Sequence, residues 1–346
     1  MRTYPWIVGE VEVSGLRFPQ VSTRLDRADI LGSFMARWGW GRMSYAVEPG
    51  LYAVGRPTAT SPVLVSANYK MSFDRLRKTL SGLDLWILVI DTKGINVWCA
   101  AGKGTFGTEE LVGRIAQVGL GDVVKGRSLI LPQLGAPGVA AHEVLKRSGF
   151  KVIYGPVRAA DIPEFLRAGQ TTTPSMRAVR FELWDRLILT PIELAQVLKP
   201  ALIMFGILFV MTLIRGGPAP FLILLGKTAA SFVPFLGAIL AGAFFTPLLL
   251  PFIPGRAFAW KGWLLGLAWT MLYLQLTTPW HEWKTALLYL LLLPPMASFL
   301  AMNFTGATTF TSLSGVVKEM KIALPLQIVS AGLGILVLIL TLGATL

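Results

Sequence analysis

Cys99 is the residue of this 346-residue chain whose setting most favours metal chemistry. It lies in the run NVWCAAGKG, residues 96–104, directly after a strongly apolar stretch. Asn96 can cap a short helix over residues 97–101 that Gly102 would end, which puts Cys99 in the first helical turn. The positive end of a helix favours the thiolate, the form in which cysteine binds metals. The alternative is a buried cysteine without chemistry, since cysteine is among the most frequently buried residues.

A glycine fingerprint overlaps the same run, because Gly102, Gly104 and Gly107 satisfy the G-x-G-x-x-G spacing of dinucleotide-binding loops. This spacing is weak evidence for dinucleotide binding, because the glycines begin about ten residues after the apolar run ends at Thr92. In addition, no acidic residue closes a second strand about 20 residues further on. A single cysteine excludes intramolecular disulfides and an iron–sulfur cluster bound by this chain alone.

Strands and helices that alternate along the chain are expected to position the Cys99 loop. The expected strands are 62–68, 85–92, 128–132 and 150–155, and the expected helices are FDRLRKTLSG ending at Gly82, TEELVGRIAQVG capped by Thr108, GVAAHEVLKRSG, and 161–167. This alternation predicts a Rossmann-like α/β domain of about residues 44–170, with a parallel sheet covered on both faces. Ligands of such folds bind at the carboxyl ends of the strands, where Asn68, Thr92, Gln133 and Gly135 lie beside the Cys99 loop. Residues 4–41 show no pattern that assigns them.

The second half of the sequence is typical of a membrane protein. Hydrophobic residues make up 53% of the chain and charged residues 15%, against roughly 25% charged in soluble domains. Apolar stretches near the length of a bilayer core predict an all-α bundle of about five transmembrane helices, at residues 197–214, 221–250, 260–277, 286–302 and 324–342. Pro234 and Pro247 are expected to kink the second of them.

Three parts follow from these patterns. Residues 1–170 are expected to form a cytosolic ligand-binding domain, residues 171–196 a linker and interfacial helix, and residues 197–346 the transmembrane domain. The interfacial helix is expected over residues 176–193, where arginines alternate with apolar side chains.

The distribution of basic loop residues predicts the orientation in the membrane. Lys199, Arg256, Lys261, Lys318 and Lys321 outnumber Arg215, His281 and Lys284 on the other side. This places the N-terminal domain in the cytosol of a multi-pass cytoplasmic membrane protein, and the first residues lack the apolar core of a signal peptide. Basic flanks facing anionic lipid also account for much of the net charge of +13, and no nucleic-acid-binding motif is present.

The run Asn96–Lys103 resembles the cap-helix motif of the membrane-bound corrinoid proteins of microbial mercury methylation, the HgcA family. That family is related to the large subunit of corrinoid iron–sulfur proteins. All eight positions match, and the plan of a corrinoid domain followed by five membrane helices is similar too. Residues 68–75, 131–139 and 305–315 resemble the family more loosely.

The resemblance implies that residues 1–170 are a corrinoid-binding domain, which holds a cobalt corrinoid of the cobalamin type base-off, with Cys99 as lower axial ligand and catalytic residue. The expected cofactor-binding residues are Asn96, Val97, Trp98, Cys99, Ala100, Ala101, Gly102, Lys103, Asn68, Thr92, Gln133 and Gly135. A solvated side chain without a ligand is an equally open interpretation of Lys103. Ordinary loop structure is equally open for the four residues outside the motif, which are Asn68, Thr92, Gln133 and Gly135. The usual D-x-H-x-x-G cobalamin motif is absent, and neither His142 nor His281 has that setting.

The activity implied is that of a methyltransferase that passes a methyl group from methyl-cobalt(III) to inorganic Hg(II), giving methylmercury. A thiolate ligand donates strongly to cobalt and should labilise the methyl group towards a soft acceptor. The implied partners are a methyltetrahydrofolate-type donor or its methyltransferase, and a ferredoxin-like protein with two [4Fe-4S] clusters as electron donor.

Two other functions stay open at this point. One is a membrane-bound corrinoid methyl carrier of one-carbon metabolism, on the folate and acetyl-CoA pathway. The other is a transporter or receptor with a regulatory nucleotide domain, although the spans contain hardly any of the ionisable residues that commonly mark transport pathways.

Overall fold

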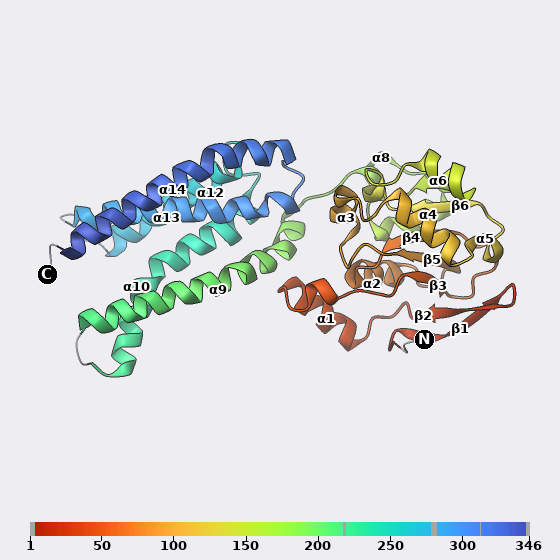
Figure 1. The fold of residues 1–346 in the computed structure, drawn as a ribbon, viewed down its shortest axis with the longest axis horizontal. Helices are drawn as coiled ribbons and strands as arrows, with labels where there is room; N and C mark the ends of the chain where they lie inside the picture. Colours follow the sequence, from red (N-terminus) through yellow and green to blue (C-terminus); the bar gives the residue numbers. More distant parts are fainter. Residues whose placement is uncertain (1–3, 217–218, 278–281, 312, 344–346) are drawn as a thin grey trace. The chain divides into compact units, whose positions relative to one another are not determined.

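A computed structural model describes residues 4–216, 219–277, 282–311 and 313–343 of the chain. His281 and part of the segment 305–315 lie outside the described residues. The chain divides into two compact units, Met1–Val179 and Arg180–Leu346. The first is an α/β domain and the second is entirely helical (Figure 1), as the sequence predicts.

The α/β domain is built on one sheet with the strand order β1-β2-β3-β5-β4-β6-β7. Its strands are β1 (Ile7–Val13), β2 (Leu16–Val21), β3 (Gly50–Val54), β4 (Val63–Ala67), β5 (Leu85–Ile90), β6 (Ser128–Leu131) and β7 (Lys151–Tyr154). The four strands from β4 to β7 are parallel neighbours, and they are the four that the apolar runs predict. β3 pairs with β5 in the antiparallel sense, and the β1–β2 hairpin extends the sheet beyond β3.

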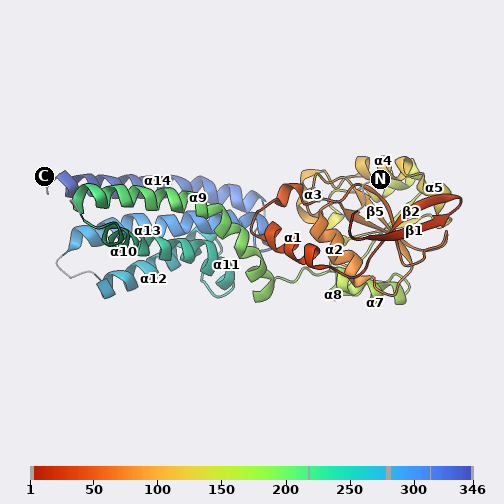
Figure 2. The same cartoon turned by 90° about the horizontal axis from the view of Figure 1, so that it is seen from below.

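Helices cover both faces of this sheet because its central strands are apolar on both sides. On β4, Val63 and Val65 pack into one core cluster and Leu64 into the other. The first face carries α3 (Val97–Lys103), α4 (Thr108–Gln117), α5 (Leu120–Val123) and α6 (Ala141–Ser148), and the second carries α2 (Lys70–Thr79) and α7 (Ile162–Arg167). Figure 2 gives a second view of the two layers. This arrangement confirms the doubly covered sheet expected from the sequence.

One predicted helix cap is wrong. Gly107, in an extended conformation, precedes α4, and Thr108 is the first residue of the helix. The Thr108 hydroxyl oxygen instead accepts a hydrogen bond from the N–H of Ala140, at 2.9 Å. Thr108 therefore ties α4 to the segment before α6, a contact that no local pattern could reveal.

The N-terminal segment that the sequence left unassigned forms a hairpin and a helix. β1 and β2 are joined through Ser14 and Gly15, both with positive φ, as tight hairpin turns require. The helix α1 (Arg27–Arg37) and the short 3-10 helix η1 (Arg42–Ser44) follow. The alternation of apolar and polar residues in IVGEVEV was the available sequence signal for β1. The pattern covers only one short strand at the edge of the sheet, so it did not assign the segment.

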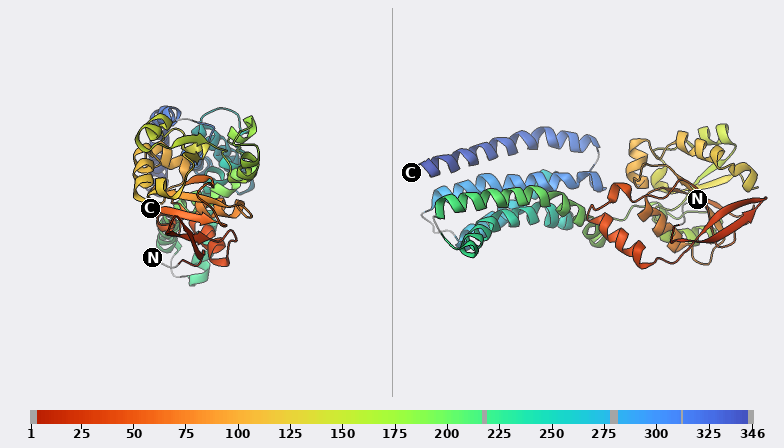
Figure 3. Two further views of the ribbon diagram at one scale, coloured as in Figure 1. Left: turned by 90° about the vertical axis from the view of Figure 1, so that its right-hand side faces the viewer. Right: turned by 60° about the horizontal axis from the view of Figure 1, so that its bottom comes forward.

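The second unit consists of long helices that lie side by side (Figure 3). They are α9 (Leu183–Gly216), α10 (Phe221–Leu240) continuing through the π-helical turn η4 (Ala241–Phe245) into α11 (Thr246–Leu249), α12 (Phe258–Thr277), α13 (Trp283–Asn303) and α14 (Leu313–Gly343). Four of these are long and apolar enough to cross a membrane, which indicates membrane association. α12 is not among the four, because Lys261, Gln275 and its tryptophans lower its apolarity.

The expected interfacial helix over residues 176–193 is not a separate element. The chain forms α8 (Pro174–Arg177), and α9 then runs from Leu183 without interruption through Pro191 and Pro200. Arg186 of its first turns is buried and donates hydrogen bonds to the carbonyl oxygens of Leu248 and Phe181. The sequence pattern could not distinguish an arginine that faces a membrane surface from one that binds free carbonyl groups at a helix end.

Candidate functional site

The loop between β5 and α3 holds Cys99 as the sequence predicts. Asn96 is extended and its side-chain oxygen accepts a hydrogen bond from the N–H of Cys99, at 2.9 Å. The helix does not end at Gly102, however. It continues to Lys103 and ends at Gly104, whose φ of 79° is the left-handed conformation that glycine adopts most easily.

Asn68 fixes the start of this loop from the end of the neighbouring strand β4. Its side-chain oxygen accepts hydrogen bonds from the N–H groups of Thr92 and Gly94, at 3.1 and 3.0 Å, and lies 2.8 Å from the Thr92 hydroxyl. Its amide nitrogen donates to Asp91 at 3.1 Å. Asn68 and Thr92 are both buried, so the structure brings these two expected residues together as a support for the Cys99 loop. Their contact with a cofactor stays a prediction.

α3 presents two different faces. Ala100 and Ala101 are buried in the core, so their small side chains allow α3 to pack against the loop after β6. Trp98 and Lys103 are exposed, and Cys99 is partly exposed on the same outer side. At Gly102, one turn after Cys99, an added Cβ would meet nothing within 4 Å. The outer face of α3 is therefore open around the thiol.

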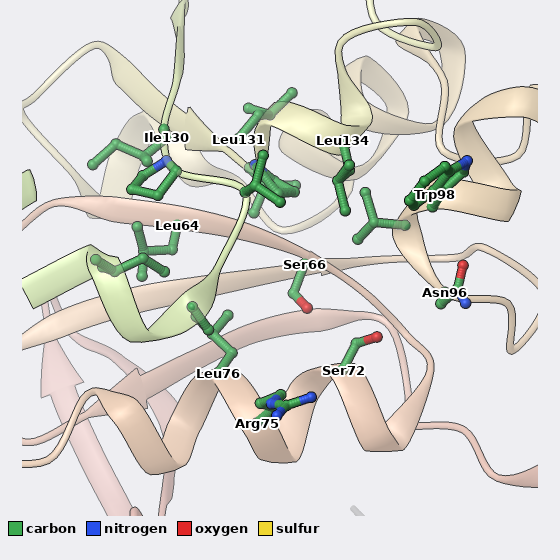
Figure 4. A pocket seen from close by; sticks show the side chains of 18 residues that line it. Leu64, Ser66, Ser72, Arg75, Leu76, Asn96, Trp98, Ile130, Leu131 and Leu134 are labelled. Carbon is green, nitrogen blue, oxygen red and sulfur yellow. The ribbon is translucent and has the colours of Figure 1, made fainter. Parts of the chain in front are cut away.

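A cavity of about 300 Å³ lies at the carboxyl ends of β4 and β6, on the α2 side of the sheet. Figure 4 shows Trp98 and Asn96 at one end of it, Leu131 and Leu134 on the opposite wall from α2, and Ser66, Ser72 and Arg75 around its polar part. Most of the lining is apolar. Asn96, Val97 and Trp98 line it, whereas Cys99 does not, so the thiol lies beside the cavity and not within it.

Three sequence segments far apart in the chain meet at this cavity. They are residues 68–75, which contribute Ser72 and Arg75, residues 96–103, and residues 131–139, which contribute Leu131 and Leu134. These are the three segments of the α/β domain that resemble the corrinoid family. Their convergence is a property of the tertiary structure and not of the spacing along the chain.

The loop after β6 contributes Gln133 and Gly135 in different ways. A Cβ at Gly135 would lie 2.5 Å from the ring of Phe106, so this glycine permits the loop to pack on Phe106. The side-chain oxygen of Gln133 is buried and accepts no hydrogen bond from the described residues. A buried acceptor without a donor is costly, so this oxygen fits a ligand with an N–H group, although neither Gln133 nor Gly135 lines the cavity.

Sequence reasoning missed Ser66, Ser72 and Arg75 as lining residues. Ser66 is buried, and it interrupts the otherwise apolar run VLVSA of β4, which was the available signal. Ser72 and Arg75 lie on one face of α2, which the sequence alone could not turn towards the cavity.

These residues could hold a cofactor that needs a single protein ligand and a largely apolar binding surface. No three His, Cys, Asp or Glu side chains converge as a metal site within the described residues. A corrinoid brings its own equatorial nitrogens, so one partly exposed thiol beside an apolar cavity, with an open position at Gly102 and an unpaired acceptor at Gln133, fits such a group.

Comparison with known proteins relates much of the α/β domain to corrinoid proteins. Residues 40–166 match the family of the CO dehydrogenase/acetyl-CoA synthase delta subunit. The gamma subunits of the acetyl-CoA decarbonylase/synthase complexes of Methanopyrus kandleri and Methanocaldococcus jannaschii are 34% and 30% identical over 122 and 128 residues, which is 35% and 36% of this chain and 26% of each relative. The corrinoid/iron–sulfur protein large subunit of Moorella thermoacetica is 30% identical over 124 residues, 35% of this chain and 27% of that protein.

The chain thus spans about a quarter of the length of the curated relatives it matches. The matched region is the part of the α/β domain that includes the Cys99 loop, whereas β1, β2, α1 and the helical second unit lie outside the family match. The α/β domain of this chain is related to a family of corrinoid proteins.

Proposed function

We propose that this chain is a membrane-bound, corrinoid-dependent methyltransferase whose α/β domain binds the corrinoid against the outer face of α3. The observation that carries the proposal is the convergence of residues 68–75, 96–103 and 131–139 on one apolar cavity beside a partly exposed thiol. The similarity of the domain to corrinoid proteins supports the same assignment.

Each residue of the site has a distinct role in this proposal. Cys99 would hold the corrinoid cobalt through its thiolate, and Asn96 positions Cys99 in the first turn of α3 by accepting a hydrogen bond from its N–H. Gly102 leaves room for a flat macrocycle, and Gln133 accepts an N–H from one of its carboxamide side chains. When bound, a corrinoid carries a methyl group and releases it to an acceptor. Strong donation from a thiolate favours that release to a soft electrophile.

We further propose that the acceptor is inorganic Hg(II), on the strength of the eight-residue match between Asn96–Lys103 and the mercury-methylation motif. The methyl group comes from a methyltetrahydrofolate-type donor or its methyltransferase. Corrinoids must be returned to their reduced form after accidental oxidation, and one cysteine cannot hold an iron–sulfur cluster. A ferredoxin-like protein with two [4Fe-4S] clusters is therefore the proposed electron donor. The long apolar helices are proposed to cross the cytoplasmic membrane with the α/β domain in the cytosol.

The test is to replace Cys99 by Ala and to follow both the cobalt spectrum and methylmercury formation. Cys99→Ala removes one partly exposed atom and should cost the fold about 1 kcal/mol or less. We expect the protein to keep its corrinoid, to lose the absorption features of sulfur ligation, and to lose methyl transfer. Asn96→Ala should act in the same direction more weakly, since loss of an N-cap costs about 1 kcal/mol. Methylation at the wild-type rate by Cys99→Ala would refute the role of the thiol.

Gly102→Ala is the matched control, because it separates cofactor binding from folding. An added methyl group meets no protein atom at this helical position, so the variant should be more stable by about 0.5–1 kcal/mol. If the corrinoid lies against this face, the same methyl group should weaken corrinoid binding, measured by retention of cobalt on a desalting column. Unchanged corrinoid affinity would place the cofactor elsewhere.

A corrinoid methyl carrier of one-carbon metabolism is the second candidate, and the names of the relatives favour it, since they belong to acetyl-CoA decarbonylase/synthase complexes. The two functions differ in the acceptor. Rapid loss of the methyl group from the loaded protein on addition of Hg(II) supports the first. Loss only on addition of an acetyl-CoA synthase would support the second.

A further inference from the structure

The helix α1 is attached to the α/β domain by charge and exposes its apolar side chains. Asp29, which is buried, pairs with Lys70 at 2.6 Å and with Arg77 at 2.5 Å, and both basic residues belong to α2. The rest of the inner face is made of small residues. A Cβ at Gly32 would lie 2.7 Å from the Tyr45 hydroxyl oxygen, and Ala36 is fully buried. An ordinary surface helix does the opposite and buries its apolar side chains.

The outer face of α1 and the turn after it form what we call the α1 patch. Its six apolar residues are exposed by 38% to 71% and are Ile30, Leu31, Phe34, Met35, Trp40 and Met43. So many exposed apolar side chains in one short segment are uncommon on a domain surrounded only by water, and they indicate a contact with a membrane or a protein.

The segment that carries the patch is also basic. Residues 27–43 contain Arg27, Arg37 and Arg42, and their one carboxylate, Asp29, is already paired in the interior. Burial lowers the pKa of Arg37, and the charges of Arg75 and Arg42 lower it further. Exposed Phe, Trp and Leu in a segment with three arginines are the composition of segments that lie in the interface of an anionic membrane.

The second unit of the same chain is proposed to lie in a membrane. Residues 178–182 separate α8 from α9, which is one of the four helices long enough to cross a bilayer. Five residues span at most about 18 Å, and the part of α9 before its expected span, residues 183–196, adds about 21 Å of helix. If α9 crosses a membrane as proposed, the α/β domain is therefore tethered within a few tens of ångströms of the lipid surface. Figure 2 shows α1 as a surface element of that domain, alongside α2.

We infer that the α1 patch inserts into the headgroup region of an anionic bilayer and docks the α/β domain on the membrane. Because Lys70 and Arg77 of α2 pair with α1, and Ser72 and Arg75 between them line the cavity, such docking would hold the cavity at a fixed position relative to the lipid surface. The inference does not depend on the identity of the cofactor.

The test uses the full chain in lipid nanodiscs with an environment-sensitive fluorophore at a single new cysteine. Phe34→Cys in a Cys99→Ala background places the label in the patch, and Val8→Cys, at an equally exposed position of β1, is the matched control. Lipids with a nitroxide on the acyl chain should quench the label at residue 34 and leave the label at residue 8 unaffected. Ile30→Cys serves as a second patch position if Phe34→Cys folds poorly.

The charge requirement is tested in the same assay. Arg37→Gln should lower the ratio of docked to free domain about fivefold in nanodiscs containing phosphatidylglycerol, the equivalent of about 1 kcal/mol per basic residue, and much less in purely zwitterionic nanodiscs. Equal quenching at residues 34 and 8 would overturn the inference. A label at residue 34 that is shielded from water but not quenched by lipid would also overturn it, because a protein surface would then cover the patch.

Discussion

Asn68→Ala is the substitution that tests most directly how the sheet positions the Cys99 loop. It removes the acceptor of the N–H groups of Thr92 and Gly94, which are both buried. Each buried N–H left without a partner costs about 1–3 kcal/mol, so the expected loss of stability is about 2–5 kcal/mol. Loss of the bond donated to Asp91 adds little, because that side chain is partly exposed and also paired with Lys93.

Asn68→Asp is the informative control for this prediction. Its carboxylate keeps the acceptor for the Thr92 and Gly94 N–H groups but faces the Asp91 oxygen at about the distance of the present hydrogen bond, 3.1 Å. The variant should be destabilised less than Asn68→Ala near pH 5 and increasingly as the pH rises, because two carboxylates cannot both ionise freely at this distance. A pH-independent penalty equal to that of Asn68→Ala would contradict the hydrogen-bond assignment.

Pulse proteolysis in increasing urea is a suitable assay, since it reports opening of the α/β domain in the full chain in detergent. If Asn68→Ala shifts the unfolding free energy of this domain by less than about 0.5 kcal/mol, the loop is not held by these hydrogen bonds and the reasoning is refuted. Methyl transfer should fall with the same variant, because the loop that carries Asn96 and Cys99 is then free to shift.

Three further predictions concern stability and topology. Burial alone would raise the pKa of Asp29, but hydrogen bonds from Lys70 and Arg77 hold this pKa below its ordinary value. The stability that the Asp29 carboxylate contributes to the domain is therefore complete above its unfolded pKa of about 4 and is lost as the pH falls further. Acid titration of domain stability should therefore be flatter in Asp29→Asn. Gly138→Ala should cost about 1–3 kcal/mol in urea unfolding, since its Cβ would lie 2.1 Å from the carbonyl oxygen of Phe106. Reporters fused after Met302 and at the C-terminus should lie on opposite sides of the membrane, and detection of both in one compartment would exclude the proposed topology.

The sequence alone determined the elements that depend on local pattern. The four parallel strands and the apolar helices follow from runs of residues whose length and periodicity suit one structure only, and each is present. The Asn96 cap of Cys99 was equally predictable, because a cap involves residues three apart in the chain. The end of α3 was not, since both Gly102 and Gly104 could have ended it and the left-handed turn formed at the second.

The tertiary structure decided which of the candidate residues meet. Asn68 and Thr92 are 24 positions apart, yet they form one hydrogen-bonded support because β4 and β5 are neighbours in the sheet. Ser72 and Arg75 reach the cavity only through the packing of α2 on that sheet. Likewise, α1 exposes its apolar side chains because salt bridges attach its other face to α2. The sequence of an amphipathic helix does not determine which of its faces packs against the protein.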